Sequence, residues 1–334
     1  MNSAAKKPLY PADRFLSSTQ AVSEEQLLIA AIRLDVFSFL QERTSAEVLA
    51  EKRNWHIRNT ELFLNALTAA GYIIKEDGLF ANLPDTEYYL NKQSEMYIGD
   101  YILFWHEIKK FDSIEERVEK GPTFSRFSDK NGADSYDFYQ MAKVAKTEMY
   151  TGRVQAFIGA VQSLFSWDSA INALDIGGGS GILSVELARS FPNSHSLIID
   201  QPQVIKLAEE VIKEYEVKEQ VDVMGGNFIT DDFGGGYDLV IASAIFDFAG
   251  DLDAMAEKIY DSVKTGGFMY VDTHMVSDDF TAPKNCIIGW LPSHLDGLDI
   301  LKCDSEITGA IEKAGFIKYL DGKEQDFPGY VYKK

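Results

Sequence analysis

The sequence predicts an α/β protein in which a mainly parallel, doubly wound sheet follows a helical N-terminal region. Three observations lead to this prediction. Short apolar runs alternate with amphipathic helical segments from about residue 170 onward. A loop rich in glycine joins the first of these runs to a helix. The chain has 334 residues, which is more than one typical hydrophobic core holds and favours about two domains.

The N-terminal part has the pattern of helices followed by a hairpin. Residues 1–20 show no periodicity, so we expect a loose arm there. The capping-box patterns Ser23-x-x-Gln26 and Thr44-x-x-Glu47 predict two helix starts. A third helix should run from about Asn59 to Gly71, before a hairpin that turns at Asp77-Gly78. This order suggests a winged helix.

The charge of this unit argues against nucleic acid as its partner. The whole chain carries 52 acidic and 32 basic residues and a formal net charge of −20. Residues 44–90 share the negative sign and contain no basic recognition helix. We therefore expect the unit to contact protein, as the interface of a homodimer, and not DNA.

The rest of the chain divides into a helical region and a sheet region, so the expected domains are residues 1–95, 96–165 and 166–334. The middle region is helical and dense in aromatic residues, which suits a linker or lid that lines a pocket. Strands are expected near residues 171–176, 196–199, 221–224, 237–242, 267–272, 316–320 and 329–332. Helices are expected near residues 182–191, 204–215, 251–263 and 305–314. In such sheets, ligands bind at the carboxyl ends of the strands.

The glycine loop Leu174–Gly181 is the most informative motif. Its glycines allow a sharp turn and the close approach of a ligand to the backbone. The spacing is not that of dinucleotide-binding proteins, because Ile182 stands where G-x-G-x-x-G requires its last glycine. Asp175 would repel a pyrophosphate but suits an ammonium or sulfonium group. Asp200 ends the next strand and can accept hydrogen bonds from both ribose hydroxyls. Together these residues favour S-adenosylmethionine as the ligand.

These motifs resemble those of class I S-adenosylmethionine-dependent methyltransferases of the plant-type O-methyltransferase family. The resemblance covers nearly the whole chain and includes Leu28–Phe37, which is similar to the N-terminal helix of the family's winged-helix dimerisation domain. Asp200-Gln201-Pro202 stands where the family has Asp-Leu-Pro, and Gly226-Asn227-Phe228 where it has Gly-Asp-Phe. The resemblance implies a Rossmann-like methyltransferase sheet, S-adenosylmethionine as cofactor and a small-molecule methyl acceptor. The implied cofactor-binding residues are Asp175, Gly177, Gly179, Gly181, Asp200, Gln201, Asn227, Phe228 and Ser243.

One segment departs from the family at the position of its catalytic histidine. Where O-methylating members have His-Asp-Trp, this chain has Phe246-Asp247-Phe248. Phenylalanine cannot accept a proton, and a general base is worth ~10²–10⁴-fold when the acceptor needs one. His294 is the leading substitute base, and Asp247 is retained. His274 and His106 are further candidates.

The acceptor pocket is expected between the aromatic helices and residues 285–299. The expected acceptor-binding residues are Trp105, His106, Tyr139, Phe246, Trp290 and His294. Four alternatives follow from the missing histidine. The acceptor is already nucleophilic, another residue is the base, the enzyme uses S-adenosylmethionine without methyl transfer as a decarboxylase, hydroxylase or cyclase, or the protein only binds the cofactor.

Several other classes of function are not expected. No apolar run reaches the ~18–20 residues of a membrane span, and no apolar segment of a signal peptide follows the first residues. The two cysteines, Cys286 and Cys303, are too few for a disulfide framework and suggest a reducing cytoplasm. The five histidines show no HxxxH or HExxH spacing, so we expect no metal.

Overall fold

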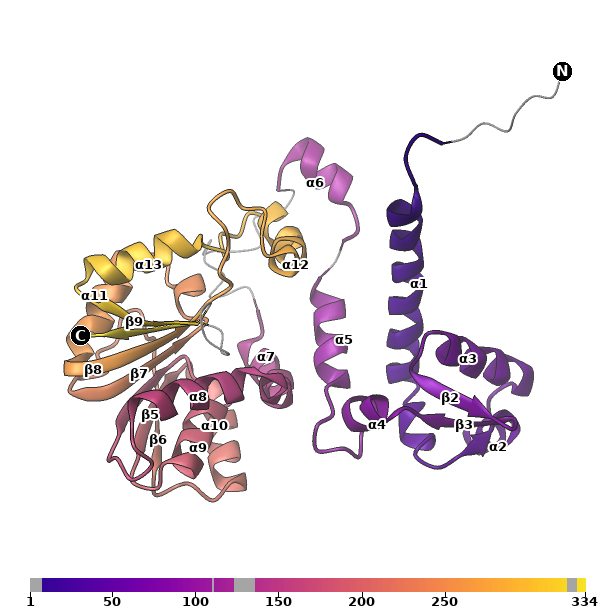
Figure 1. The fold of residues 1–334 in the computed structure, drawn as a ribbon, viewed down its shortest axis with the longest axis horizontal. Helices are drawn as coiled ribbons and strands as arrows, with labels where there is room; N and C mark the ends of the chain where they lie inside the picture. The colour runs from indigo at the N-terminus through magenta and orange to yellow at the C-terminus, as the bar shows by residue number, and fades with distance from the viewer. Residues whose placement is uncertain (1–7, 110, 123–135, 323–328) are drawn as a thin grey trace. The chain divides into compact units, whose positions relative to one another are not determined.

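The structure is a computed structural model that describes residues 8–109, 111–122, 136–322 and 329–334. The chain forms two compact units, and the boundary between them falls after Leu103 (Figure 1). The three-part division expected from the sequence stays a prediction.

The first unit consists of helices around a small antiparallel sheet. Its sheet has the order β1-β3-β2, with strands β1 (Thr44–Ser45), β2 (Ile73–Glu76) and β3 (Leu79–Asn82). Its helices are α1 (Asp13–Arg33), η1 (Phe37–Phe39), α2 (Ala46–Arg53), α3 (Ile57–Ala69) and α4 (Pro84–Leu90), and α5 (Gly99–Ile108) begins in it. Asp77 and Gly78 both have positive φ, as the tight hairpin turn requires. The predicted helices and hairpin are thus confirmed.

Two predicted details of this unit are wrong. Helix α1 begins at Asp13, so residues 13–20 are helical and not a loose arm. Ser23 lies inside this helix, where its hydroxyl donates to the Thr19 carbonyl at 3.4 Å instead of capping a helix start. The cap of α2 is Ser45, whose side chain accepts the Val48 N–H at 3.2 Å. The helix begins at Ala46, one residue later than the motif predicts, so Ser45 and not Thr44 is the N-cap.

The second unit is built on a mainly parallel sheet, as predicted. Its described strands have the order β6-β5-β4-β7-β8-β10-β9, and β10 runs antiparallel to β8 and β9. The strands are β4 (Asn172–Ile176), β5 (His195–Asp200), β6 (Val221–Gly225), β7 (Tyr237–Ser243), β8 (Val263–Asp272), β9 (Ile317–Asp321) and β10 (Tyr330–Lys333). From β4 the chain proceeds outward to β6, then returns to β7 on the other side of β4. This reversal opens a crevice at the carboxyl ends of β4 and β7.

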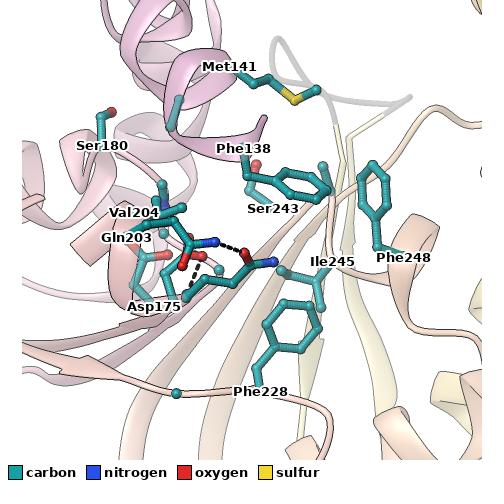
Figure 2. A pocket seen from close by; sticks show the side chains of 18 of the residues that line it. Phe138, Met141, Asp175, Ser180, Gln203, Val204, Phe228, Ser243, Ile245 and Phe248 are labelled. Atoms are coloured by element: carbon teal, nitrogen blue, oxygen red, sulfur yellow. Dashed lines mark hydrogen bonds between the residues drawn. The ribbon is translucent and has the colours of Figure 1, made fainter. Parts of the chain in front are cut away.

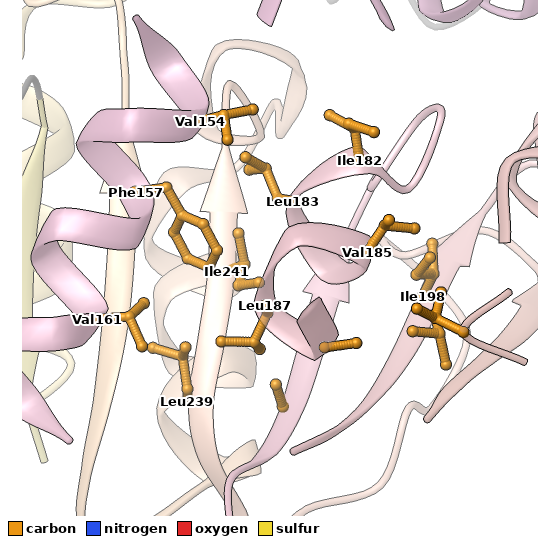
Figure 3. Close-up of a cluster of buried hydrophobic side chains, with 14 of the residues drawn as sticks. Val154, Phe157, Val161, Ile182, Leu183, Val185, Leu187, Ile198, Leu239 and Ile241 are labelled. Atoms are coloured by element: carbon orange, nitrogen blue, oxygen red, sulfur yellow. The ribbon is translucent and has the colours of Figure 1, made fainter. Parts of the chain in front are cut away.

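Helices cover both faces of this sheet. The described helices of this unit, besides the end of α5, are α6 (Ile114–Lys120), α7 (Phe138–Glu148), η2 (Met149–Thr151), α8 (Arg153–Leu164), α9 (Ile182–Ser190), α10 (Pro202–Glu214), η3 (Phe246–Phe248), α11 (Leu252–Ser262), α12 (Lys284–Leu295) and α13 (Asp304–Lys313). Helices α8, α9 and α10 build one core (Figure 3), and α11 and α13 build the other on the opposite face (Figure 1). Within the described ranges, no helix is both long and apolar enough to cross a membrane.

A buried arginine fastens α6 to α12. Arg117 is only 8% exposed, and its guanidinium donates to the Pro292 carbonyl at 3.2 Å and to the Asp296 carboxylate at 3.4 Å. It also donates to the Asp112 carbonyl at 2.5 Å. Because a buried guanidinium needs such partners, Arg117 fixes where α12 lies.

We predict that Arg117→Met lowers the free energy of unfolding by about 3 kcal/mol, since it leaves buried acceptors without their donor. Lys120→Met is the matched control on the same helix. It removes an exposed pair with Glu116, which is worth less than about 0.5 kcal/mol. Urea unfolding followed by tryptophan fluorescence measures both variants. Equal midpoints for the two variants would contradict the prediction.

Candidate active site

A cavity of about 720 Å³ lies at the carboxyl ends of β4, β5 and β7. The glycine loop, residues 200–204, residues 225–231 and residues 243–245 surround it, and Phe138 and Met141 of α7 contribute side chains. Figure 2 shows Phe138, Ile245 and Phe248 gathered on one side of this space. Its volume is typical of a site for a small molecule or cofactor.

The glycine loop turns sharply and leaves its backbone open to the cavity. Gly177, Gly179 and Gly181 all have positive φ, between 60° and 75°, a conformation that other residues adopt only under strain. A Cβ on Gly177 would also collide with the side chain of Ile245. The loop therefore provides a cradle that a ligand can approach closely, as the sequence predicts.

Two buried carboxylates flank this loop. Asp175 is 1% exposed and accepts the Ser184 hydroxyl at 2.8 Å. Burial, with the charge of Asp200 nearby, raises the pKa of Asp175 to about 7. Asp200 accepts the backbone N–H groups of Gly179 at 2.9 Å and Gln201 at 2.7 Å. Burial also raises the pKa of Asp200, and these two hydrogen bonds oppose the shift.

Gln201 and Ser243, two of the predicted cofactor-binding residues, also line the cavity. The Gln201 side-chain carbonyl accepts a hydrogen bond from the Gln203 amide (Figure 2). The Ser243 hydroxyl donates to the Asp272 carboxylate at 3.3 Å. Each of these polar side chains is therefore held by a neighbour at the cavity wall.

The wall after β6 includes both residues predicted there. Asn227 and Phe228 line the cavity, and the carbonyl oxygen of the exposed Asn227 side chain accepts the Ile229 N–H at 2.9 Å. The carboxylate at this wall belongs instead to Asp231, which accepts the Asn227 N–H at 2.9 Å. Asp231 did not emerge from the sequence because it lies outside the Gly-Asn-Phe motif.

Arg153 is a second residue that the sequence analysis missed. It is the only cation among the described residues that line the cavity. Its guanidinium lies 3.7 Å from the Asp272 carboxylate and 3.8 Å from the Glu148 carboxylate. Because both distances exceed that of a hydrogen bond, the N–H donors of the guanidinium are able to bind a ligand carboxylate. Its only sequence signal is its position after Gly152 at the start of a helix.

An aromatic cluster continues from the cavity wall. Phe138 and Phe248 both line the cavity, and their ring centroids are 5.6 Å apart. Tyr136 lies 6.3 Å from Phe138 and 6.0 Å from Trp290, and Trp290 lies 5.5 Å from Trp105. These five residues form the aromatic cluster, which includes the predicted Trp105 and Trp290.

Two predicted acceptor residues lie elsewhere. Phe246 is fully buried in the core beneath α11 and α13, and its neighbour Phe248 faces the cavity. Tyr139 packs against the core of α8, α9 and α10, whereas Phe138 faces the cavity. In both cases the sequence indicated the right segment, but only the helix orientation decides which aromatic ring reaches the site.

The structure brings Asp247 to His274. Asp247 is completely buried, and its Oδ1 lies 3.0 Å from His274 Nδ1, although the direction is not that of a hydrogen bond. Trp290 Nε1–H donates to His274 Nε2 at 3.1 Å. Because an indole N–H only donates, Nε2 carries the lone pair, and the proton of the neutral imidazole lies on Nδ1, the nitrogen nearer to the carboxylate. The result is a carboxylate–imidazole pair at the edge of the aromatic cluster.

His294 and His106 do not contact this pair. His294 Nε2 accepts the Leu301 N–H at 3.4 Å, and burial lowers the pKa of the imidazole. His106 is half-buried on α5. No three His, Cys, Asp or Glu side chains in the described part of the chain are grouped as metal ligands.

The fold, the glycine loop and the two acids at the strand ends define a class I S-adenosylmethionine-dependent methyltransferase. The family model of the O-methyltransferase domain matches residues 133–289. This segment of the chain is therefore an O-methyltransferase domain.

Three known proteins illustrate the similarity. The tetracenomycin polyketide synthesis 8-O-methyl transferase of Streptomyces glaucescens is 26% identical over 291 residues, covering 83% of this chain and 82% of that protein. The N,N-dimethyltransferase of Streptomyces rimosus is 23% identical over 325 residues, covering 95% and 94%. The solved structure of human N-acetylserotonin methyltransferase with S-adenosylmethionine has a TM-score of 0.77 and 19% identity, covering 100% and 99%. This last likeness concerns the fold.

We predict that Asp175→Asn has opposite effects on stability and on cofactor affinity. In the native protein, the pKa of Asp175, about 7, exceeds its ordinary value of 3.8. The folded state therefore retains a proton that the unfolded state loses, and the free energy of unfolding falls as pH rises from 4 through 7. Asparagine carries no charge, so the variant should melt at a higher temperature than the wild type at pH 8, and the difference should be smaller at pH 5. Affinity for S-adenosylmethionine should fall about tenfold with the loss of the charge.

Thermal unfolding at the two pH values and calorimetric titration measure these effects. Asp168→Asn, at an exposed position, is the control and should change neither quantity. A stability gain of equal size at pH 5 and pH 8 would show that ionisation of Asp175 is not the cause.

Proposed function

We propose that this enzyme transfers a methyl group from S-adenosylmethionine to a small aromatic acceptor, with His274 as the base and Asp247 as its partner. The observation that supports this proposal best is the continuity of the aromatic cluster. It begins at the cavity wall with Phe138 and Phe248 and ends at Trp290, which contacts His274.

The residues around the cavity fit the cofactor at each of its ends. The glycine loop offers open backbone to the methionine part, Arg153 can bind its carboxylate, and the buried Asp175 gives the negative potential that suits its cationic groups. Asp200 lines the cavity, and its carboxylate can accept hydrogen bonds from the ribose hydroxyls. Phe228 offers a flat apolar face to adenine. When bound, the cofactor supplies an electrophilic methyl group beside the aromatic cluster.

The aromatic cluster suits a flat acceptor. Its rings meet edge to face, with interplanar angles from 76° to 87°, so they can present both faces and edges to a planar ring. Polar groups beside the described rings include the Tyr136 and Ser293 hydroxyls, which lie 2.6 Å apart, and the Lys109 ammonium, 5.0 Å from the Trp105 ring centroid. An apolar pocket with a few placed polar groups favours a small aromatic or heterocyclic acceptor.

His274 can take a proton from such an acceptor at Nε2. The acceptor hydroxyl or ring N–H must first replace the Trp290 N–H that Nε2 now accepts. Asp247 then faces the imidazolium across 3.0 Å and stabilises its charge out of water. The relatives act on oxygen in one case and on nitrogen in the other by their names. We leave the atom open, since the base matters only where that atom carries a proton.

Incubation with methyl-labelled S-adenosylmethionine and a panel of phenols and nitrogen heterocycles tests the function. We expect label in the acceptor and S-adenosylhomocysteine as the second product. The alternative is an enzyme that uses the cofactor without methyl transfer. It is favoured by Phe246 in place of the family's histidine and by the engagement of His274 Nε2 with Trp290. Conversion of an acceptor without label would establish that alternative, and tight binding without turnover would indicate a binding protein.

His274→Asn should lower kcat about 100-fold or more for an acceptor whose hydroxyl is protonated at the assay pH. An acceptor that is already ionised should react at nearly the wild-type rate, because it needs no base. His294→Asn is the matched control and should retain activity, since its Nε2 serves the Leu301 N–H. Loss of activity in His294→Asn alone would assign the base to His294.

We also propose that the first unit forms a homodimer through α1. The helix carries large apolar side chains in water: Phe15 is 65% exposed, Leu16 66% and Val22 59%. Phe15 and Val22 are seven residues apart and share a face of the helix. In Figure 1 this part of α1 extends beyond the small sheet of its own unit. Apolar side chains placed in this way are typical of a protein interface.

Phe15→Asp combined with Val22→Asp should convert the dimer to a monomer, because burying two carboxylates in an apolar interface is unfavourable. Light scattering after gel filtration measures the mass. Ser17→Asp, on the same helix, is the control and should leave the dimer intact. A wild-type monomer would refute the proposal.

A further inference from the structure

Lys258 on α11 holds the loop that follows β6. Its ammonium donates to three backbone carbonyls of this loop, those of Phe228 at 2.7 Å, Ile229 at 3.2 Å and Asp231 at 2.6 Å. A lysine ammonium has three N–H donors, so the three carbonyls of the loop use all the donors of Lys258. The other surface of the loop forms a wall of the cavity, because Phe228, Ile229 and Asp231 all line it.

The ammonium lies in partly buried surroundings. It is 4.5 Å from the ring centroid of Phe233, which is itself 4% exposed. Loss of water lowers the pKa of Lys258, and the charges of Asp231 and Asp232 oppose this shift. Hydrogen bonds of a charged donor are stronger than neutral ones, and more so in such surroundings.

The loop's own hydrogen bonds hold the rest of its backbone. The Asn227 N–H donates to the Asp231 carboxylate at 2.9 Å, and the Asn227 side chain accepts the Ile229 N–H. The N–H groups of Thr230 and Asp231 donate to the Asn227 carbonyl at 3.1 Å and 2.8 Å. The carbonyls of Phe228, Ile229 and Asp231 converge on one point, where their dipoles repel one another unless a cation lies between them. Lys258 is that cation.

We propose that Lys258 is a positioning residue for the nucleoside part of the cofactor. By holding three carbonyls from behind, it keeps the Phe228 ring and the Asp231 carboxylate at the cavity wall. The assignment of adenosine to this wall rests on the proposed function. The opposite wall, with Arg153 and the glycine loop, has no hydrogen bond to Lys258, so the effect should be specific to the nucleoside.

Two ligands distinguish an effect on the wall proposed for the nucleoside from an effect on the wall proposed for the amino-acid part of the cofactor. S-adenosylhomocysteine contacts both, whereas 5′-methylthioadenosine has no amino-acid part. Lys258→Met should weaken the binding of both ligands by a similar factor of about tenfold or more, since it removes charged hydrogen bonds. Arg153→Met should weaken only S-adenosylhomocysteine. Calorimetric titration of the full-length protein measures all four affinities.

Two further variants control for charge and for fold. Lys313→Met removes a surface cation of α13 that pairs with Asp253, which lies on α11 as Lys258 does. This variant should bind both ligands as the wild type does. Lys258→Arg keeps donors for the same carbonyls and should restore most of the affinity that methionine loses. If Lys258→Met does not fold, Lys258→Gln replaces it in the same comparison, because it keeps a donor but loses the charge.

Each outcome has one meaning. Equal weakening of the two ligands, with rescue by arginine, supports the role of Lys258. Unchanged affinity for 5′-methylthioadenosine in the methionine or glutamine variant overturns it. Failure of the wild-type protein to bind either ligand would instead refute the proposed function, so the two failures are distinguishable.

Discussion

Charged groups held out of water at the carboxyl end of the sheet are the constraint on which the site depends. Asp175 and Asp200 end neighbouring parallel strands and are almost completely buried. Each is stabilised only by a few hydrogen bonds from the glycine loop and the start of α9 or α10. These bonds do not offset burial, so the pKa of both carboxyls is raised. A bound cationic ligand would stabilise the ionised carboxylates. The free energy that their burial costs in the free protein would then favour binding of that ligand.

The same principle explains how one wall of the cavity and helix α12 are held. Lys258 neutralises converging carbonyls behind the loop after β6, and Arg117 satisfies carbonyls that fix α12. Both cations come from elements distant in sequence from the groups they hold. The loop after β6 is thus held by a side chain from behind, and the glycine loop leaves its backbone open to the cavity.

The sequence predicted what local pattern controls. The alternation of strands and helices indicated the sheet, and the glycine loop and Asp200 were identified because parallel strands bring their carboxyl ends together. It could not predict contacts that depend on long-range packing. Arg153, Asp231 and Lys258 belong to no local motif, and the pairing of Asp247 with His274 joins residues on different strand ends. The sequence also could not predict the direction of side chains. Phe246 lies in the core, whereas Phe248, two residues later, lines the cavity.

The burial of Asp247 links the missing histidine to the presence of His274. A carboxylate with no exposed surface is strongly unfavourable unless a positive or hydrogen-donating group lies beside it. Phe246, its neighbour in the chain, provides none, so His274 from the end of β8 is the group that faces the carboxylate. Removal of His274 alone would leave the buried Asp247 carboxylate without this neighbour, and removal of Asp247 alone would leave the imidazole without a negative charge beside it. The pair is therefore a unit, and its position beside Trp290 places the imidazole where the aromatic cluster ends.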